Sequence, residues 1–293
     1  MLDPALLAGR SRYERVMDGR VDNTHADAFT HTVRLTDDDR SLEVAVVALP
    51  SPTYAIREAR LTALGGRIGA SLPAAFARLA GDEMVGGLTR RAAELLGHDD
   101  GAALAVDATI EVARLARQVA RLPRPVAERA VAGDPLACWM LDTTGWIDLP
   151  HSCFTYSDAG RALFGTRTIA TPMVSDIYSP RPGQSRVFER RKVARLERAG
   201  DRLRLFHSMH DNVHGFELTC EIDLATATIV RAEHVTPRLP YMGVCSEPQR
   251  RFGSLVGERV DRELRKRIQV TLGGEAGCAQ LYDLTADLLK LLV

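Results

Sequence analysis

Two distant parts of the chain, 42–49 and 216–224, are rich in residues that favour strands, and hydrophobic and polar positions partly alternate along them. After a turn, a second strand is expected in each part, at 54–61 and 227–235. A period of two is typical of strands that bury one face. The pattern therefore predicts two β-hairpins.

Each hairpin is followed by apolar residues at helical spacing. Long amphipathic stretches at 73–96 and 249–272 end at glycine, which suits a helix C-terminus. A final helix is expected in each part, at 102–121 and 277–292. The second of these has one apolar stripe, formed by Leu281, Leu284, Leu288 and Leu291.

The two parts are similar in sequence. Placing 75–115 on 251–291 without a gap gives twelve identities in forty-one positions. The identical pairs include Phe76/Phe252, Leu79/Leu255, Gly81/Gly257, Leu96/Leu272, Gly97/Gly273, Asp107/Asp283 and Thr109/Thr285. Upstream, 42–62 falls on 216–236. A period of about 175 residues indicates a duplicated domain rather than a solenoid; the alternative is a chance likeness of two helix-turn-helix segments.

Strands grouped before helices predict an α+β fold. We expect a tandem duplication of an antiparallel sheet, with two C-terminal helices covering it in each copy. The first copy is placed at 1–132 and the second at 187–293. Strands at 187–196 and 203–209 extend the second sheet, whereas their counterpart at 28–36 is shorter. The second copy is therefore expected to be the more complete one.

Between the copies lies an aromatic connecting segment, 133–186, which resembles neither. Its composition suggests an ordered loop that acts as a lid over a binding site or as a structural linker. Its aromatic residues are Trp139, Trp146, Phe154, Tyr156, Phe164 and Tyr178.

Composition narrows the choice of partner. Thirty-eight Lys and Arg balance thirty-eight Asp and Glu, so a nucleic acid or an anionic membrane is not expected as a partner. No long apolar run and no signal-peptide pattern occurs, which predicts a soluble, cytoplasmic protein. Five cysteines without a CxxC pair predict reduced thiols. The sequence leaves the oligomeric state open.

Histidines cluster at the start of the second copy, at His207, His210, His214 and His234. Histidine suits acid/base catalysis near neutral pH. We expect His210 or His214 to act as a general base, with Asp211 orienting it. The alternative is that these histidines are structural residues at a hairpin end, with their hydrogen bonds satisfied.

Cys245 and Cys278 also occur only in the second copy. Cys245 follows the sheet, and Cys278 begins the last helix, where the helix dipole favours a thiolate. With His210 or His214 they could ligate zinc. Core packing is the other interpretation of each cysteine.

Several motifs in this region carry a family resemblance: Arg231-Ala-Glu, Pro240-Tyr241 with Cys245, Leu255-Val-Gly257, and the stretch from Gly273 to Leu281. From about 187 to 291 the chain resembles the bacterial family catalogued as domain of unknown function 2889. The family often has His at the position of Gln280. The resemblance implies a bacterial source and no established activity.

The order of sheet, cysteine and Cys-led helix is also remotely similar to iron–sulfur scaffold proteins of the NifU type. Those proteins use three cysteines, and the third is not found where that pattern needs it. No Walker motif, HExxH or Gly-x-Ser-x-Gly occurs, so nucleotide cofactors are not expected and no cofactor is the main prediction.

The sequence thus supports two hypotheses. The first is a small-molecule enzyme of lyase or hydratase, isomerase or hydrolase type, acting on an apolar, aromatic, carboxylated substrate. Its pocket would lie between 207–214, the loop 239–247 and the last helix, below the aromatic segment. The second is a metal or iron–sulfur carrier, or an accessory subunit of an enzyme complex.

The enzyme hypothesis assigns a role to each candidate residue. Catalytic candidates are His210, Asp211, His214, Tyr241 as acid or oxyanion donor, and Cys245. Substrate-binding candidates are Trp139, Trp146, Tyr156, Tyr178, Arg238 and Gln280.

Overall fold

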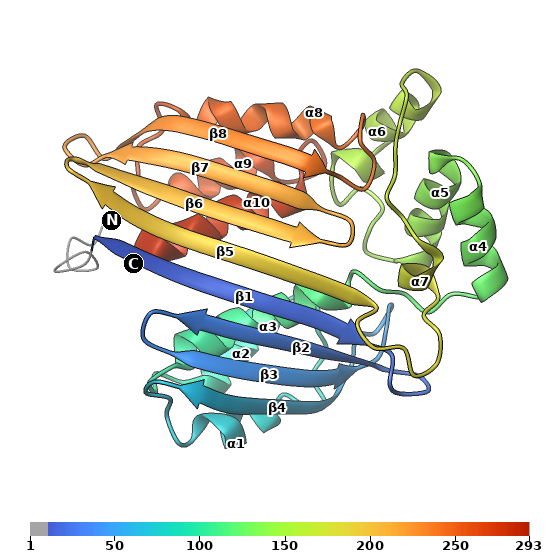
Figure 1. Cartoon of the computed structure of the whole chain (residues 1–293), viewed down its shortest axis with the longest axis horizontal. Coiled ribbons are helices and arrows are strands. Elements are labelled where there is room, and N and C mark those ends of the chain that lie inside the picture. The colour runs from blue at the N-terminus through green and yellow to red at the C-terminus, as the bar shows by residue number, and fades with distance from the viewer. Residues whose placement is uncertain (1–10, 293) are drawn as a thin grey trace.

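One antiparallel sheet of eight strands forms the centre of the computed structural model, which describes residues 11–292. In space the strands follow the order β4-β3-β2-β1-β5-β6-β7-β8 (Figure 1). Their bounds are β1 Arg12–Asp22, β2 Phe29–Asp37, β3 Ser41–Ala48, β4 Ile56–Gly65, β5 Phe188–Ala199, β6 Arg202–Asp211, β7 Gly215–Asp223 and β8 Thr228–Arg238.

The first strands of the two copies join them into this single sheet. β1 pairs antiparallel with β5, with Val16 opposite Val193. Each copy continues outward as a four-stranded meander, so the strand order is the same when counted from the centre in either direction. The α+β duplication predicted from sequence is confirmed, with an approximate two-fold relation between its halves.

Helices follow the strands in each half. In the first half they are α1 Leu72–Ala77, α2 Leu88–Leu96 and α3 Ala102–Ala116. In the second they are α8 Ser246–Gln249, η4 Arg250–Leu255, α9 Leu264–Leu272, α10 Ala279–Leu288 and η5 Leu289–Leu292. Within residues 11–292, no helix is both long and apolar enough to span a membrane.

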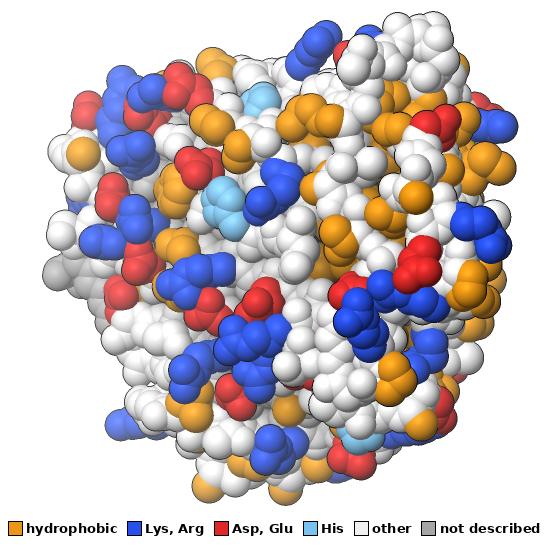
Figure 2. Space-filling model, turned by 45° about the vertical axis from the view of Figure 1, so that its right-hand side comes forward, with side chains coloured by type: hydrophobic (Ala, Val, Ile, Leu, Met, Phe, Trp, Pro, Cys, Tyr) orange, Lys and Arg blue, Asp and Glu red, His pale blue; other side chains and the backbone are white. Residues whose placement is uncertain are grey.

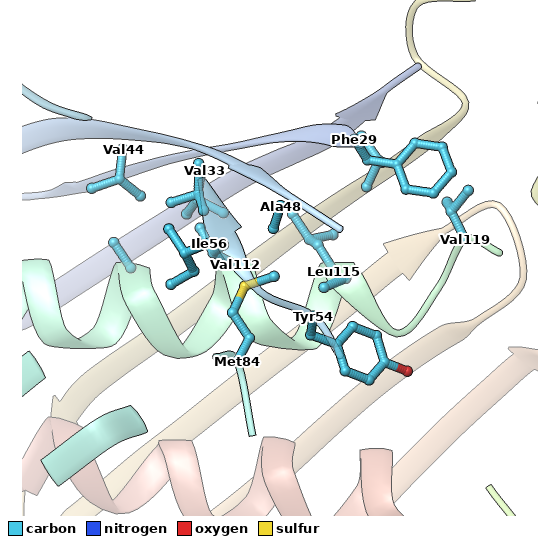
Figure 3. Packing of buried hydrophobic residues seen from close by; sticks show 14 of the residues in the cluster. Phe29, Val33, Val44, Ala48, Tyr54, Ile56, Met84, Val112, Leu115 and Val119 are labelled. Atoms are coloured by element: carbon cyan, nitrogen blue, oxygen red, sulfur yellow. The ribbon is translucent and has the colours of Figure 1, made fainter. Parts of the chain in front are cut away.

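These helices cover one face of the sheet, and the residues that the strands bury lie mainly on that face. In β3, Leu42, Val44, Val46 and Ala48 are buried, and the residues between them are more exposed. Figure 3 shows Val33 and Val44 of the sheet packed against α3, which supplies Val112 and Leu115. In the second half, all four leucines of the predicted stripe on the last helix are buried.

The long helices expected at 73–96 and 249–272 are each interrupted, so that prediction was wrong. The interruption is at Gly81 in the first half and Gly257 in the second, with φ of 94° and 95°. There the chain turns back to the sheet, and the two glycine N–H groups donate to the carbonyls of Ile56 and Ile229, both at 2.8 Å. The same deviation at equivalent positions is further evidence of duplication.

The expectation that the second copy is the more complete one was also wrong. Both halves have four strands. The sequence patterns missed β1, because charged residues obscure its alternation of apolar and polar positions. The connecting segment, expected as loop, contains several short helices at one end of the sheet (Figure 1). After α4 Arg124–Ala132 come α5 Pro135–Gly145, η2 Phe154–Tyr156, α6 Asp158–Ala162, η3 Leu163–Gly165 and α7 Ser175–Tyr178.

Charged residues join the two halves beneath the sheet, and they do so reciprocally. Arg114 of α3 lies 3.0 Å from Asp283 of α10, and Lys290 of the second half lies 2.7 Å from Asp107 of α3. In the alignment of the halves, Arg114 matches Lys290 and Asp107 matches Asp283. This exchange of equivalent ion pairs resembles the interface of a symmetric dimer.

Candidate functional site

A cavity of about 130 Å³ lies where the connecting segment meets the second half of the fold. Its walls come from α5, from the β6–β7 hairpin, from the loop after β8 and from the start of α10. Four segments that are distant in sequence therefore meet at this cavity. They are the segments that the sequence analysis placed around a pocket. Most of the lining is apolar, and Figure 2, in which this side is turned toward the viewer, shows hydrophobic side chains gathered around it.

His214 lines this cavity, and Asp211 holds its ring. The Nδ1 atom of His214 lies 3.1 and 3.2 Å from the two carboxylate oxygens of Asp211. Because an ionised carboxylate only accepts hydrogen bonds, Nδ1 carries the hydrogen and Nε2 has the free electron pair when the ring is neutral. The pair is built by the tight turn between β6 and β7, where the backbone N–H of Val213 also donates to Asp211, at 2.7 Å.

Asp211 is itself fixed by Arg190 of β5. The guanidinium Nε donates to Asp211 at 2.9 Å, and both side chains are fully buried. Burial opposes ionisation of Asp211, but the charges of His214 and Arg190 and the hydrogen bonds from His214 hold its pKa below the ordinary value. Asp211 is thus a carboxylate that holds the His214 ring, whereas the catalytic role expected of this pair stays a prediction.

His210 lies outside the cavity. It is on β6 next to Asp211, and successive strand residues point to opposite faces of a sheet. Its ring lies in a groove on the uncovered face, 3.4 Å from Glu217. Arg238 lines the same groove. The structure therefore does not bring these two candidates to the cavity.

Asp142 is a cavity residue that the sequence analysis missed. It lies on α5, is only 1% exposed, and accepts hydrogen bonds from three tyrosines. Tyr156 and Tyr178 donate at 2.8 Å each, and Tyr241 donates at closer range. Burial raises the pKa of Asp142 to about 6, although the three phenols favour the carboxylate. A lone carboxyl directly after the apolar run 135–141 was the signal that could have identified it.

The three tyrosine candidates therefore affect the cavity chiefly by donating hydrogen bonds to Asp142. Tyr156 reaches the cavity wall, whereas Tyr178 and Tyr241 are fully buried behind it. Gln280 is also on the wall, at the start of α10.

The two tryptophan candidates differ. Trp139 lies behind the wall, and its indole N–H donates to the carbonyl of Thr155 at 2.7 Å. Trp146 lines the cavity, is 3% exposed, and its indole nitrogen has no hydrogen-bond partner among residues 11–292.

Three thiols also line the cavity, those of Cys153, Cys245 and Cys278. Cys278 is the N-cap of α10, as expected, but the predicted thiolate was wrong, because burial raises its pKa to about 11. Burial likewise raises the pKa of Cys245, whose sulfur lies 3.0 Å from the Thr155 hydroxyl. All three are therefore neutral thiols near pH 7.

The proposed metal ligands are not gathered around one point. His210 lines the groove on the uncovered face, whereas His214, Cys245 and Cys278 line different parts of the cavity wall. In the described part of the chain, no group of three His, Cys, Asp or Glu side chains is placed to hold a metal ion. The arrangement does not fit zinc or an iron–sulfur cluster bound by these residues.

Residues 195–293 match the model of a family described as protein of unknown function (DUF2889). The match is confined to this stretch, which resembles that family. The DUF2889 stretch supplies His214, Cys245, Cys278 and Gln280 to the cavity, whereas Asp142 and Trp146 come from outside it. No curated protein and no solved structure matches the chain. The likeness to iron–sulfur scaffold proteins stays a prediction.

Proposed function

We propose that the cavity is the active site of an enzyme that moves protons on a small, mainly apolar molecule. The observation that carries this proposal is that two separate titratable groups, His214 and Asp142, line one small apolar cavity. Perturbed or specifically oriented titratable groups in such a cavity are typical of catalytic sites.

His214 is suited to be the general base. Its Nε2 accepts a proton from a carbon next to a carbonyl group, and the electron pair of that C–H bond moves toward the carbonyl oxygen. Asp211 stabilises the imidazolium that forms, because its carboxylate is held close to Nδ1.

Asp142 is suited to the opposite role. With a pKa of about 6, it is present both with and without its proton near neutral pH. Together with the Tyr156 hydroxyl it can supply a proton to the developing oxyanion or to a second carbon. Return of the proton to another carbon gives isomerisation, and loss of a neighbouring leaving group gives elimination, whose reverse is hydration.

Deuterium exchange tests this proposal without knowledge of the full reaction. A panel of aryl ketones, enones and aryl thioesters is incubated with the protein in D₂O, and deuterium uptake is followed by mass spectrometry. We expect at least one compound to exchange faster than without protein. His214→Asn should lower that rate about 100-fold or more.

His210→Asn is the matched control. This histidine is four residues away on the other face of the sheet, so its replacement should leave the exchange rate within about twofold. The proposal fails if no compound exchanges above the protein-free rate. Equal loss in both variants would also contradict it.

A further inference from the structure

The wall of the cavity contains a hydrogen-bond donor that lacks an acceptor. Trp146 follows α5, one turn after Asp142, and its backbone N–H donates to the Asp142 carbonyl at 3.1 Å. Its indole N–H is buried and finds no partner in the described residues. Buried tryptophan N–H groups are usually hydrogen-bonded, as that of Trp139 is here. A ligand that offers an acceptor would satisfy Trp146.

The cavity offers no free positive charge to such a ligand. Arg117 is the cationic side chain among the described lining residues other than histidine. It is paired with Asp148, and each of its three nitrogens already donates a hydrogen bond. Nε donates to Asp148 at 2.8 Å, and Nη1 and Nη2 donate to the carbonyls of Ala113 and Met84, both at 2.9 Å. Asp142 adds negative charge to the wall. A buried carboxylate without a counter-charge is unfavourable, so the acceptor belongs to a neutral group.

The size of the cavity limits the ligand further. Its volume of about 130 Å³ is close to that of an apolar protein cavity of about 150 Å³ that takes up one benzene ring. The apolar lining includes Leu149, Ile177 and Phe216, which suit a ring or a short branched chain.

We propose that the cavity binds a neutral carbonyl compound of about single-ring size, whose oxygen accepts a hydrogen bond from the indole N–H of Trp146. This proposal rests on the proposed function in that it concerns the same cavity. It replaces the carboxylated substrate that the enzyme hypothesis from the sequence named.

Calorimetric titration with three probes tests the proposal: acetophenone, ethylbenzene and benzoate at pH 7.5. Acetophenone should bind most tightly, because ethylbenzene lacks the acceptor and benzoate carries a charge. Trp146→Phe should weaken acetophenone binding about tenfold and change ethylbenzene binding by less than about twofold. Tightest binding of benzoate, an equal loss for both other probes, or no binding of any probe would overturn the proposal.

Indole ¹⁵N NMR of the wild-type protein keeps the test decisive if Trp146→Phe fails to fold. The chain has two tryptophans, and Trp139 serves as the internal reference. Acetophenone should move the Trp146 N–H proton signal downfield and leave that of Trp139 nearly unchanged, whereas ethylbenzene should not cause the downfield shift. An unchanged Trp146 signal with bound acetophenone would overturn the proposal.

The experiments distinguish a failure of this binding proposal from a failure of the proposed function. Binding of acetophenone through Trp146 without deuterium exchange in any compound would retain this inference and reject the catalytic role. Deuterium exchange of a panel compound, with acetophenone leaving the Trp146 N–H signal unchanged, would do the opposite.

Discussion

At the cavity, a carboxyl group is surrounded by three phenols and has no cation among its hydrogen-bond partners in the described structure. The tyrosine hydroxyls satisfy Asp142 as an acceptor, but they carry no charge to compensate its burial. Its ionised form is therefore kept at a cost in stability. A costly group of this kind is expected where function requires it.

Asp142→Asn tests that cost through the pH dependence of stability. The pKa of about 6 in the folded protein is above the ordinary 3.8, so folding favours the protonated form. The associated stability is fully present below about pH 4 and is lost as pH rises through about 6, by ~3 kcal/mol in total. The amide cannot ionise and lacks this loss.

Urea unfolding of wild type and Asp142→Asn at pH 4 and pH 7.5 measures the effect. The variant should gain ~2.4 kcal/mol relative to wild type between the two pH values, because at pH 4 the unfolded carboxyl is already partly ionised. A difference between the proteins that does not change with pH would show that Asp142 titrates normally.

Sequence reasoning located the region of the cavity but not all of its side chains. His214, Cys245 and Gln280 are on its wall, because the segments that carry them were placed correctly. It could not separate His210 from His214, since that depends on which strand residue precedes the turn. It also missed Asp142: the carboxyl after an apolar run marked the position, but its tyrosine partners come from distant positions that no local pattern connects.

At the scale of elements, the two interrupted helices show where periodicity is insufficient. The apolar spacing of 73–96 continues through Gly81, so the pattern alone predicts one helix. The turn is set by a left-handed glycine and by hydrogen bonds to the start of β4, including one from Met84 N–H to the carbonyl of Tyr54 at 3.0 Å. Its counterpart in the second half is the bond from Val260 to Ala227, at 2.7 Å.

Gly81→Ala should destabilise the protein by about 1–2 kcal/mol. An added Cβ would meet no atom within 4 Å, so the cost arises from the φ of +94° alone. Gly86→Ala is the matched control, because it has equally open surroundings and no positive φ.

Thermal and urea unfolding of the two variants compares them directly. The control should be neutral or slightly stabilising, since alanine restricts the unfolded chain. Equal stability of both variants would contradict the backbone argument.

At the scale of the whole molecule, the halves share a sheet and a buried charge network and should unfold together. Beneath the sheet, Lys192 of β5 donates to Glu111 of α3 at 2.8 Å, and Arg114 lies close to Glu111, Asp283 and Asp287. The alignment of the halves revealed the duplication, but not that equivalent residues exchange partners. Side-chain pairing between halves depends on how β1 meets β5.

Arg114→Met should cost about 3–5 kcal/mol, because it leaves buried carboxylates without their main counter-charge. Lys290→Met removes the equivalent residue of the second half, which is more exposed, with 28% of its side chain accessible against 15% for Arg114. Its cost should be smaller, about 1 kcal/mol. Urea unfolding followed by circular dichroism and by tryptophan fluorescence measures both. A larger loss for Lys290→Met, or two separate transitions in wild type, would contradict this account.

The central claim is that His214 acts chemically on a molecule bound in this cavity. The most direct test measures binding and deuterium exchange of one exchanging carbonyl compound with wild type and with His214→Asn. We predict that the variant binds the compound within about threefold of wild type and exchanges it about 100-fold or more slowly. Unchanged exchange in His214→Asn, with binding intact, would contradict the claim.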